Sequence, residues 1–312
     1  MSVRESTGSK EAQPTSGAAG SWQRRLRSAR YDIGFVGPGV VFFAVFVMLA
    51  FGMSVYYSFT DWNVVSGEAP WVGLDNYRAV VDDPRVLDSA RFTASFAVVT
   101  TVLSNALGLG LALLVTQPVF FKNVYRVTFF LPNVIGGVIL GYVFRFIFSS
   151  TFGAIGEATG IGFFEFAWLG TPTTGFWATV IVFVWKSSGY LMVIYIAAIV
   201  TVDSSLLEAA KIDGAGWYQT TRRIILPLIA PAVTIGVFLM LAISSKLFDV
   251  NFALTAGGPY GSTEAFALNI YNEAFVYNNQ GTASAKAVIF FLIVGMITLI
   301  QVAFSKRREV DA

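Results

Sequence analysis

Six long apolar runs constrain the fold of this chain more than any other feature of its sequence. They cover, approximately, residues 33–59, 92–115, 127–148, 175–200, 228–247 and 287–304. A helix needs about 20 mostly apolar residues to cross a bilayer, and only helices or closed barrels satisfy the backbone there. Because these runs do not alternate between apolar and polar residues, they predict helices. We therefore expect an all-α polytopic membrane protein with six transmembrane helices.

The composition excludes several kinds of chemistry. Only 13% of the 312 residues are charged, and the chain contains no cysteine and no histidine. That rules out disulfides, Cys/His metal sites and histidine acid–base catalysis. There is no G-x-x-x-x-G-K-[ST] phosphate-binding loop, and a net charge of +2 is too small to indicate a nucleic-acid partner. We expect no catalytic site, no metal site and no ATP hydrolysis by this chain itself.

The distribution of lysine and arginine predicts the orientation in the membrane. Most of them lie before the first run, after the second, after the fourth and beyond the sixth. Such segments stay on the cytoplasmic side, so both termini are expected there. We expect a partly disordered basic tail over 1–32, a membrane domain over 33–304 and a short tail over 305–312. The stretch 21–31 is either an interfacial helix or a plain charged anchor.

The other connections are acidic and face outward in this orientation. Their carboxylates are Asp61, Glu68, Asp75, Asp82, Asp83, Asp88, Glu157, Glu165, Glu264 and Glu273. By themselves these residues indicate a solvated face.

The charged connection over 203–227 predicts a helix, a turn and a second helix. Asp203 or Ser204 can cap the first helix. "DGAG" at 213–216 then permits a sharp turn, because glycine adopts positive φ without strain. Asp213 can cap the second helix.

The second helix of this connection should continue to about residue 225 and carry one apolar stripe. Trp217, Thr221, Ile224 and Ile225 recur at helical spacing. No lipid surrounds these side chains in a cytoplasmic loop. They either dock into a groove on a partner or pack under the protein's own spans.

Several motifs carry a family resemblance. Glu208-Ala209-Ala210, Asp213-Gly214 and Leu226-Pro227 resemble the cytoplasmic EAA loop of permease subunits of bacterial ATP-binding-cassette importers. "SFTDWN" (58–63), "VGLDNY" (72–77), "RVTFFLPNVIGGVILG" (126–141) and "LTAGGPYGST" (254–263) resemble the sugar-importing branch of the maltose/glycerol-phosphate type. The resemblance covers about 33–304.

This resemblance implies a fold, a location and partners. The fold is the type I importer permease (MetI-like) fold in the cytoplasmic membrane. The partners are a second, homologous permease, two cytoplasmic ATPase subunits that bind ATP and Mg²⁺, an extracytoplasmic solute-binding protein, membrane lipid and a sugar. The residues implied in ATPase coupling are Glu208, Ala209, Ala210, Asp213, Gly214 and Trp217. Where the family usually has an aromatic residue, this chain has Thr221, and Trp217 lies one turn earlier.

Charged residues inside apolar runs mark candidate functional positions. Arg145 ends the third run, Lys186 lies within the fourth, and Lys246 and Asp249 end the fifth. The last two are three residues apart, so they can pair on one helix face. The alternatives are snorkelling to the interface and a purely structural ion pair.

Two spans are predicted to line a substrate pathway. In "VWKSSGYLM" (184–192) a glycine among serines can kink the helix toward a cavity. A sugar needs aromatic faces for its C–H groups and polar side chains for its hydroxyls. The candidates are Trp185, Tyr190 and Phe248 for stacking, and Ser187, Ser244, Asp249 and Asn251 for hydrogen bonding. Each of these residues can instead pack against lipid or a neighbouring helix.

The sequence therefore predicts a permease that imports a sugar by alternating access, driven by a separate ATPase. A sugar phosphate or polyol is an alternative substrate. An ion-gradient transporter is a rival, although the midplanes of the expected spans lack the carboxylates it would need. A membrane-embedded enzyme and a simple membrane anchor are further rivals.

Overall fold

A computed structural model describes residues 35–64, 67–117 and 120–306. The expected N-terminal tail, its candidate interfacial helix over 21–31 and the last six residues lie outside this range. The chain divides into two compact units, 1–53 and 54–312. Regular structure in the described residues is helical, apart from one bridge between Thr60 and Trp71.

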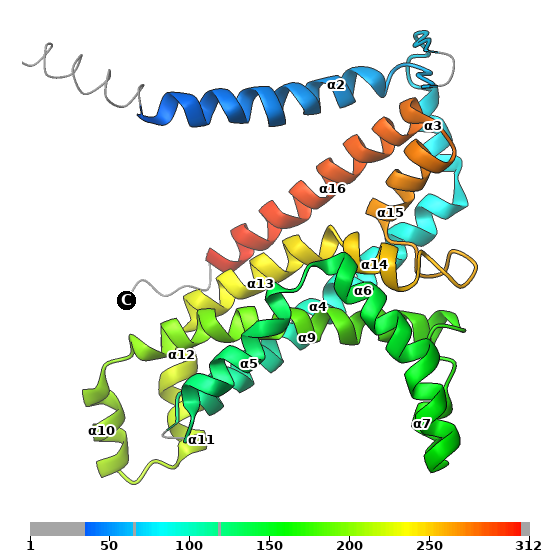
Figure 1. Ribbon diagram of the computed structural model, residues 1–312. Coiled ribbons are helices and arrows are strands. Elements are labelled where there is room, and N and C mark those ends of the chain that lie inside the picture. Colours follow the sequence, from blue (N-terminus) through cyan, green and yellow to red (C-terminus); the bar gives the residue numbers. More distant parts are fainter. Residues whose placement is uncertain (1–34, 65–66, 118–119, 307–312) are drawn as a thin grey trace, which may run out of the picture. The chain divides into compact units, whose positions relative to one another are not determined.

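Five helical stretches are long and apolar enough to cross a membrane. They are Phe35–Tyr57, Pro84–Val115, Gly137–Thr159, Pro172–Val200 and Gln280–Gln301. A sixth span results if Trp217–Leu228 and Ala230–Ser245, which meet at a 71° bend, are counted as one. The prediction of an all-helical polytopic protein is confirmed (Figure 1).

The first span contains η1 (Ala44–Leu49) and α2 (Ala50–Tyr57). Phe35–Tyr57 matches the first apolar run closely. Its described side chains up to Leu49 are exposed or half-buried, as expected for a helix whose apolar surface faces lipid.

The predicted third span was placed wrongly. The run over 127–148 is broken at Ile135 and Gly136, whose backbones are extended. Pro132 lies just before the break, where its missing N–H weakens the helix. The candidate span therefore starts at Gly137 instead of Val127. The elements around the break are α5 (Lys122–Val134), α6 (Gly137–Phe146), η2 (Ile147–Thr151), α7 (Phe152–Thr159) and α8 (Gly162–Glu165).

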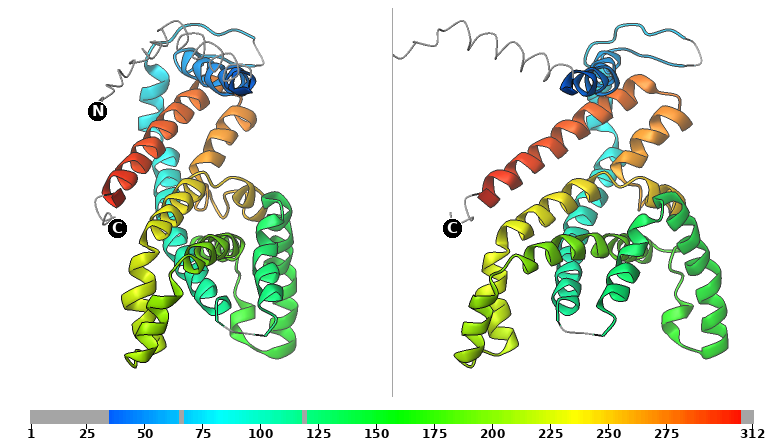
Figure 2. Two further views of the ribbon diagram at one scale, coloured as in Figure 1. Left: turned by 90° about the vertical axis from the view of Figure 1, so that its left-hand side faces the viewer. Right: turned by 60° about the vertical axis from the view of Figure 1, so that its left-hand side comes forward.

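Two long helices form the centre of the second unit. α4 (Pro84–Val115) packs along α9 (Pro172–Val200), and α13 (Ala230–Ser245) packs against α4. The buried rings of Phe96 and Phe183 meet edge to face at 5.2 Å between α4 and α9. α5 also crosses α9. Figure 2 shows these helices from two further sides.

Gly189 does not break α9, and its role differs from the one expected. α9 is one α-helix throughout, and Gly189 is buried where α5 crosses it. A Cβ at this position would collide with the carbonyl oxygen of Phe129. Glycine is therefore required here for close helix packing, and its backbone does not face a cavity.

The remaining elements lie at the ends of these helices. α3 (Asp75–Asp82) and the pair α15 (Phe266–Tyr271) and η4 (Asn272–Val276) pack on α16 (Gln280–Lys306). α14 (Asp249–Leu254) packs on α6. α16 begins seven residues before the sixth run predicted, because its first two turns mix small and polar residues. Lys286 therefore lies inside the helix.

Candidate functional site

The connection between α9 and α13 begins with a well-capped helix. α10 (Ser204–Ile212) starts after Asp203, whose Oδ1 accepts a hydrogen bond from the backbone N–H of Ser205 at 2.9 Å. This bond lowers the pKa of Asp203 below its ordinary value. The predicted N-cap is therefore present at Asp203, one of the two positions considered.

Gly214 makes the turn that ends α10. Its φ is +77°, and its N–H donates to the carbonyl of Lys211 at 3.1 Å. The N–H of Ala215 donates to the carbonyl of Ala210 at 2.9 Å. These two bonds form a Schellman motif, which favours glycine at this position.

The second helix starts later than predicted. Asp213 is the C-cap residue that follows the first helix, and it does not cap the second. That role belongs to Gly216, whose N–H donates to Oε1 of Gln219 at 3.3 Å. The elements that follow are α11 (Trp217–Thr220), η3 (Thr221–Ile225) and α12 (Leu226–Leu228).

The apolar stripe predicted for this helix is divided. Thr221 and Ile225 are buried, whereas Trp217 is 55% exposed. Trp217 therefore does not replace Thr221 in the packing of the helix. Its indole lies on the surface instead.

The residues of this connection, 203–227, are called the coupling insert from here on. Its yellow-green helices extend beyond the ends of α9 and α13 (Figures 1 and 2). Leu206, Ile212 and Tyr218 are exposed, as are Glu208, Ala209, Lys211 and Asp213, while Ala210 is buried. Within the described chain, no residue of the insert forms an ion pair. The insert thus presents apolar side chains and unpaired charges to solvent.

A cavity of about 370 Å³ lies between the break in α5–α6, the middle of α9 and the junction of α13 and α14. We call it the membrane cavity. It is lined by Asn133, Gly137, Phe183, Lys186, Ser187, Tyr190, Met240, Ile243, Lys246, Leu247, Phe248, Asp249 and Val250. The structure therefore brings together Ser187, Tyr190, Phe248 and Asp249 from the predicted pathway.

Three predicted pathway residues lie elsewhere. Trp185 is 43% exposed and packs edge to face on Phe144 at 5.4 Å. Ser244 is fully buried and donates to the carbonyl of Met240 at 2.5 Å.

Asn251, the third of these, is fully buried, and its side chain holds the outer loop in place. Its Nδ2 donates to the carbonyl of Thr263 at 2.8 Å and to Oγ1 of Thr255 at 2.9 Å. Its Oδ1 accepts from the N–H of Ala265 at 3.0 Å. All three bonds join it to protein groups, so this amide is engaged in structure.

The charges of the membrane cavity are not paired as expected. α13 ends at Ser245, so Lys246 and Asp249 do not share a helix face. No ion pair joins them in the part of the chain that the structure describes. A Cβ on Gly137 would lie 2.6 Å from Cβ of Asp249, so glycine allows α6 to approach this carboxylate closely.

Asn133 and Lys246 line the cavity but were absent from the predicted set. The signal for Asn133 was its position directly after Pro132, near the end of α5 and just before the break. Backbone breaks at membrane depth are tolerated where they border protein or an aqueous cavity. The same argument applies to Lys246, which follows the last residue of α13.

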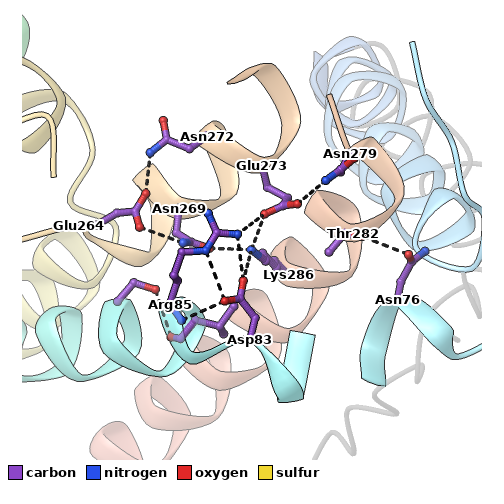
Figure 3. A network of polar contacts seen from close by, with 12 residues as sticks. Asn76, Asp83, Arg85, Glu264, Asn269, Asn272, Glu273, Asn279, Thr282 and Lys286 are labelled. Atoms are coloured by element: carbon purple, nitrogen blue, oxygen red, sulfur yellow. Dashed lines mark hydrogen bonds and ion pairs between the residues drawn. The ribbon is translucent and has the colours of Figure 1, made fainter. Parts of the chain in front are cut away.

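A polar cluster joins α4, η4 and α16 on the opposite side of the unit from the insert. Lys286 is fully buried, and its Nζ lies 2.7 Å from Glu273 Oε2, 3.0 Å from Asn269 Oδ1 and 3.3 Å from Asp83 Oδ2 (Figure 3). Arg85 reaches Asp83 at 3.2 Å and Glu273 at 3.4 Å. These five residues are called the outer ion cluster.

The outer ion cluster corrects the interpretation of the outer acidic residues as a solvated face for two of them, Asp83 and Glu273. Glu273 is only 5% exposed and also accepts from Asn279 at 2.8 Å. Burial raises the pKa of Asp83, but hydrogen bonds from Arg85 and the charge of Lys286 outweigh this effect and lower it. Lys286 was missed because the sixth span was expected to start one residue after it.

A bent, broken-helix membrane bundle with an exposed loop insert defines a polytopic transport subunit. Residues 104–310 match the family described as "Binding-protein-dependent transport system inner membrane component". The chain belongs to this family. It is therefore a multi-pass permease of the inner membrane and not an enzyme.

Curated relatives support this assignment. The chain is 46% identical over 277 residues to the probable starch degradation products transport system permease protein AmyD of Thermoanaerobacterium thermosulfurigenes, covering 89% of this chain and 94% of that one. It is 32% identical over 266 residues to the multiple sugar-binding transport system permease protein MsmF of Streptococcus mutans serotype c, covering 85% and 92%.

A solved structure supports the fold. A chain of a bacterial ABC transporter involved in the import of the acidic polysaccharide alginate superposes with a TM-score of 0.78. It is 19% identical and covers 91% of this chain and 99% of that one. At this identity the likeness establishes the fold alone.

Proposed function

We propose that this chain is one half of the membrane pore of an ATP-driven importer of a mono- or oligosaccharide. The coupling insert carries the proposal: its helices are capped and turned by local interactions, yet it exposes Leu206, Ile212 and Trp217. Exposed apolar side chains on a short, rigid helix pair favour docking into a partner groove. Membership in a family of binding-protein-dependent transport components also argues against the rival mechanism, transport driven by an ion gradient.

The proposed partner at the insert is a cytoplasmic ATPase subunit that binds ATP and Mg²⁺. Glu208, Ala209, Asp213 and Trp217 are exposed and are assigned to this contact. Ala210 is buried, and its carbonyl accepts the turn bond from the N–H of Ala215, so we assign it to holding the shape of the insert. In this arrangement both termini are cytoplasmic.

We propose three further partners for the complete importer: a second, homologous permease, a second ATPase copy and an extracytoplasmic solute-binding protein. One chain supplies a single insert, while the motor is a dimer. Closure of the ATPase dimer draws the two inserts together and opens the cavity outward, as in other hinge and shear transitions.

The membrane cavity is the proposed sugar passage within this chain. Tyr190 and Phe248 offer aromatic faces, and Ser187 and Asp249 offer polar groups. The relatives named for starch degradation products and multiple sugars support a sugar over other solutes. Trp185, Ser244 and Asn251 are assigned to packing and loop support.

A sugar phosphate is the second candidate. Two lysines, Lys186 and Lys246, line the membrane cavity, and Asp249 is the one carboxylate among its lining residues. This excess of positive charge suits an anionic group. An uptake assay in which a phosphorylated and a neutral glucose oligomer compete distinguishes the two candidates. The oligomer that is taken up in preference belongs to the class of the substrate.

The experiment for the proposed function combines co-purification with uptake. Replacing Ile212 and Trp217 by Glu should release the ATPase from the purified complex and stop sugar uptake, since both side chains lie at the surface. Asp249→Ala should leave the complex intact and reduce uptake. If the doubly substituted chain still retains the ATPase, the contact lies elsewhere, and the proposal fails.

A further inference from the structure

A second, larger hollow lies near the outer ion cluster. It has a volume of about 760 Å³ and shares no lining residue with the membrane cavity. Three segments form it: the start of α4, the start of α9 and the loop over 260–264. We call it the outer pocket. Its size lies within the range of sites that hold small ligands.

The wall of the outer pocket combines aromatic rings with charges of both signs. Phe92 and Phe176 meet edge to face at 5.8 Å, and Tyr260 stands fully exposed at the rim. The charged lining residues are Arg85, Arg91, Asp88 and Glu264.

The balance of charge in this wall favours a neutral polyhydroxyl ligand. Two arginines offer donors and two carboxylates offer acceptors, so a hydroxyl group can both donate and accept. An anion would meet the carboxylates, and a lipid chain would desolvate the Arg91–Asp88 pair without offering it a hydrogen bond. Aromatic faces complete the set of groups that a sugar ring requires.

Two polar groups of the outer pocket, Arg85 and Glu264, are held by neighbouring side chains that do not line the pocket. Arg85 is held by Asp83 and Glu273 of the outer ion cluster. Glu264 accepts from Nδ2 of Asn269 at 3.0 Å and of Asn272 at 2.5 Å (Figure 3). Side chains that are ordered before the ligand arrives lose less entropy on binding.

The loop that carries Tyr260 is also held in place. Oγ1 of Thr263 donates to the carbonyl of Gly258 at 2.6 Å, and the amide of Asn251 binds the carbonyl of Thr263. The ring of Tyr260 is fully exposed, so packing against the described residues does not account for an aromatic residue at this position. Stacking of the Tyr260 ring on a ligand would explain why an aromatic residue stands at this position.

From these observations we infer that the outer pocket is a second saccharide-binding position, which receives a neutral oligosaccharide before it enters the membrane cavity. This inference rests on the proposed function of sugar import. It assigns Asp83 and Glu273 a positioning role, because they hold Arg85 and do not themselves line the pocket.

The test measures binding of maltotetraose, a neutral glucose oligomer, to the full permease–ATPase complex in nanodiscs without the solute-binding protein. Tyr260→Ala and Arg91→Ala should each weaken binding about tenfold, as expected for one lost stacking or charged hydrogen-bond contact. Both side chains are largely exposed, so neither change should disturb folding. The KM for uptake should rise while kcat stays close to that of the wild type.

Arg78→Ala is the matched control. Arg78 is also exposed and also pairs with an aspartate three residues earlier, at 3.0 Å, but it does not line the outer pocket. Binding of maltotetraose should be unchanged in this variant.

Three results would overturn the inference. The first is no binding of maltotetraose to the wild-type complex, and the second is equal binding by wild type and both variants. The third is unchanged maltotetraose binding with weakened binding of the solute-binding protein, which would make the pocket a protein-docking surface. If Asp249→Ala still reduces sugar uptake while the complex stays intact, the proposed function survives any of these results.

Discussion

The coupling insert and the outer ion cluster use the same residue types in opposite ways. Glu208 and Lys211 of the insert are exposed and lack ion-pair partners among the described residues. Lys286 and Glu273 of the cluster are buried and lie 2.7 Å apart. Exposed charges of one region remain free for a partner, whereas buried charges of the other already satisfy each other.

This difference determines what a substitution should do. Removing an exposed, unpaired charge costs little folding free energy but changes the surface that a partner meets. Removing one member of a buried pair leaves the other desolvated and alone, which destabilises the fold strongly. The comparison therefore separates loss of coupling from loss of folded protein.

The largest expected effect is that of Lys286→Met. The substitution keeps the length of the side chain but leaves Glu273 buried without its closest cation. We expect a loss of about 3–5 kcal/mol of folding free energy, measured as the thermal stability of the detergent-solubilised protein. Lys211→Met on the insert is the control and should leave the melting temperature unchanged.

A double variant sharpens this prediction. Replacing Lys286 by Met and Glu273 by Leu removes both charges, and an apolar pair of similar volume can substitute for a buried ion pair. The double variant should recover part of the stability lost by Lys286→Met. If the double variant is instead less stable than Lys286→Met alone, Lys286 does not stabilise the fold through its ion pair with Glu273.

The next largest effect is on coupling. Glu208→Lys reverses an exposed charge on α10, and we expect sugar uptake to fall to background while thermal stability stays at the wild-type level. The measurements are uptake in cells and the melting temperature of the purified complex. Glu157→Lys, also exposed and in α7, is the control and should preserve uptake.

A smaller effect is expected at the turn of the insert. Gly214 has a φ of +77°, where a Cβ costs about 1 kcal/mol. Gly214→Ala should therefore lower the uptake rate by no more than about fivefold, by loosening α10 relative to α11. Gly216→Ala is the matched control, because Gly216 has a φ of −72°. Equal losses of uptake rate in the two variants would show that the positive φ of Gly214 has no special role.

The smallest predicted effect depends on pH. The lowered pKa of Asp83 means that its carboxylate stabilises the folded state above the ordinary pKa of 3.8 and loses this contribution as pH falls through the lowered value. Asp83→Asn should lower the melting temperature at neutral pH by an amount equivalent to about 1 kcal/mol or less. The difference from wild type should shrink as the pH falls through the lowered pKa of Asp83.

The sequence predicted features that depend on local interactions. The cap at Asp203 and the turn at Gly214 involve neighbours within a few residues, so propensity and spacing were sufficient. The residues of α9 that face the membrane cavity were found because a polar cluster in an apolar run stands out.

Features that depend on distant residues were missed. The break in the third run follows from Pro132 together with packing of α6 on α14, and hydropathy alone could not locate it. Lys286 meets Asp83 across 203 residues of chain. Asn251 was assigned to the substrate because its partners, Thr263 and Ala265, lie in a loop whose path the sequence does not reveal.

The most direct test of the account is protection of the coupling insert by the ATPase. The chain has no cysteine, so Ile212→Cys introduces a single thiol at a position that is 86% exposed. We predict that a maleimide labels this thiol rapidly in the isolated permease and at least about tenfold more slowly in the complete complex, since a docked helix excludes solvent. Equal labelling rates in the two samples would contradict docking at the insert and, with it, the contrast between the two charged regions.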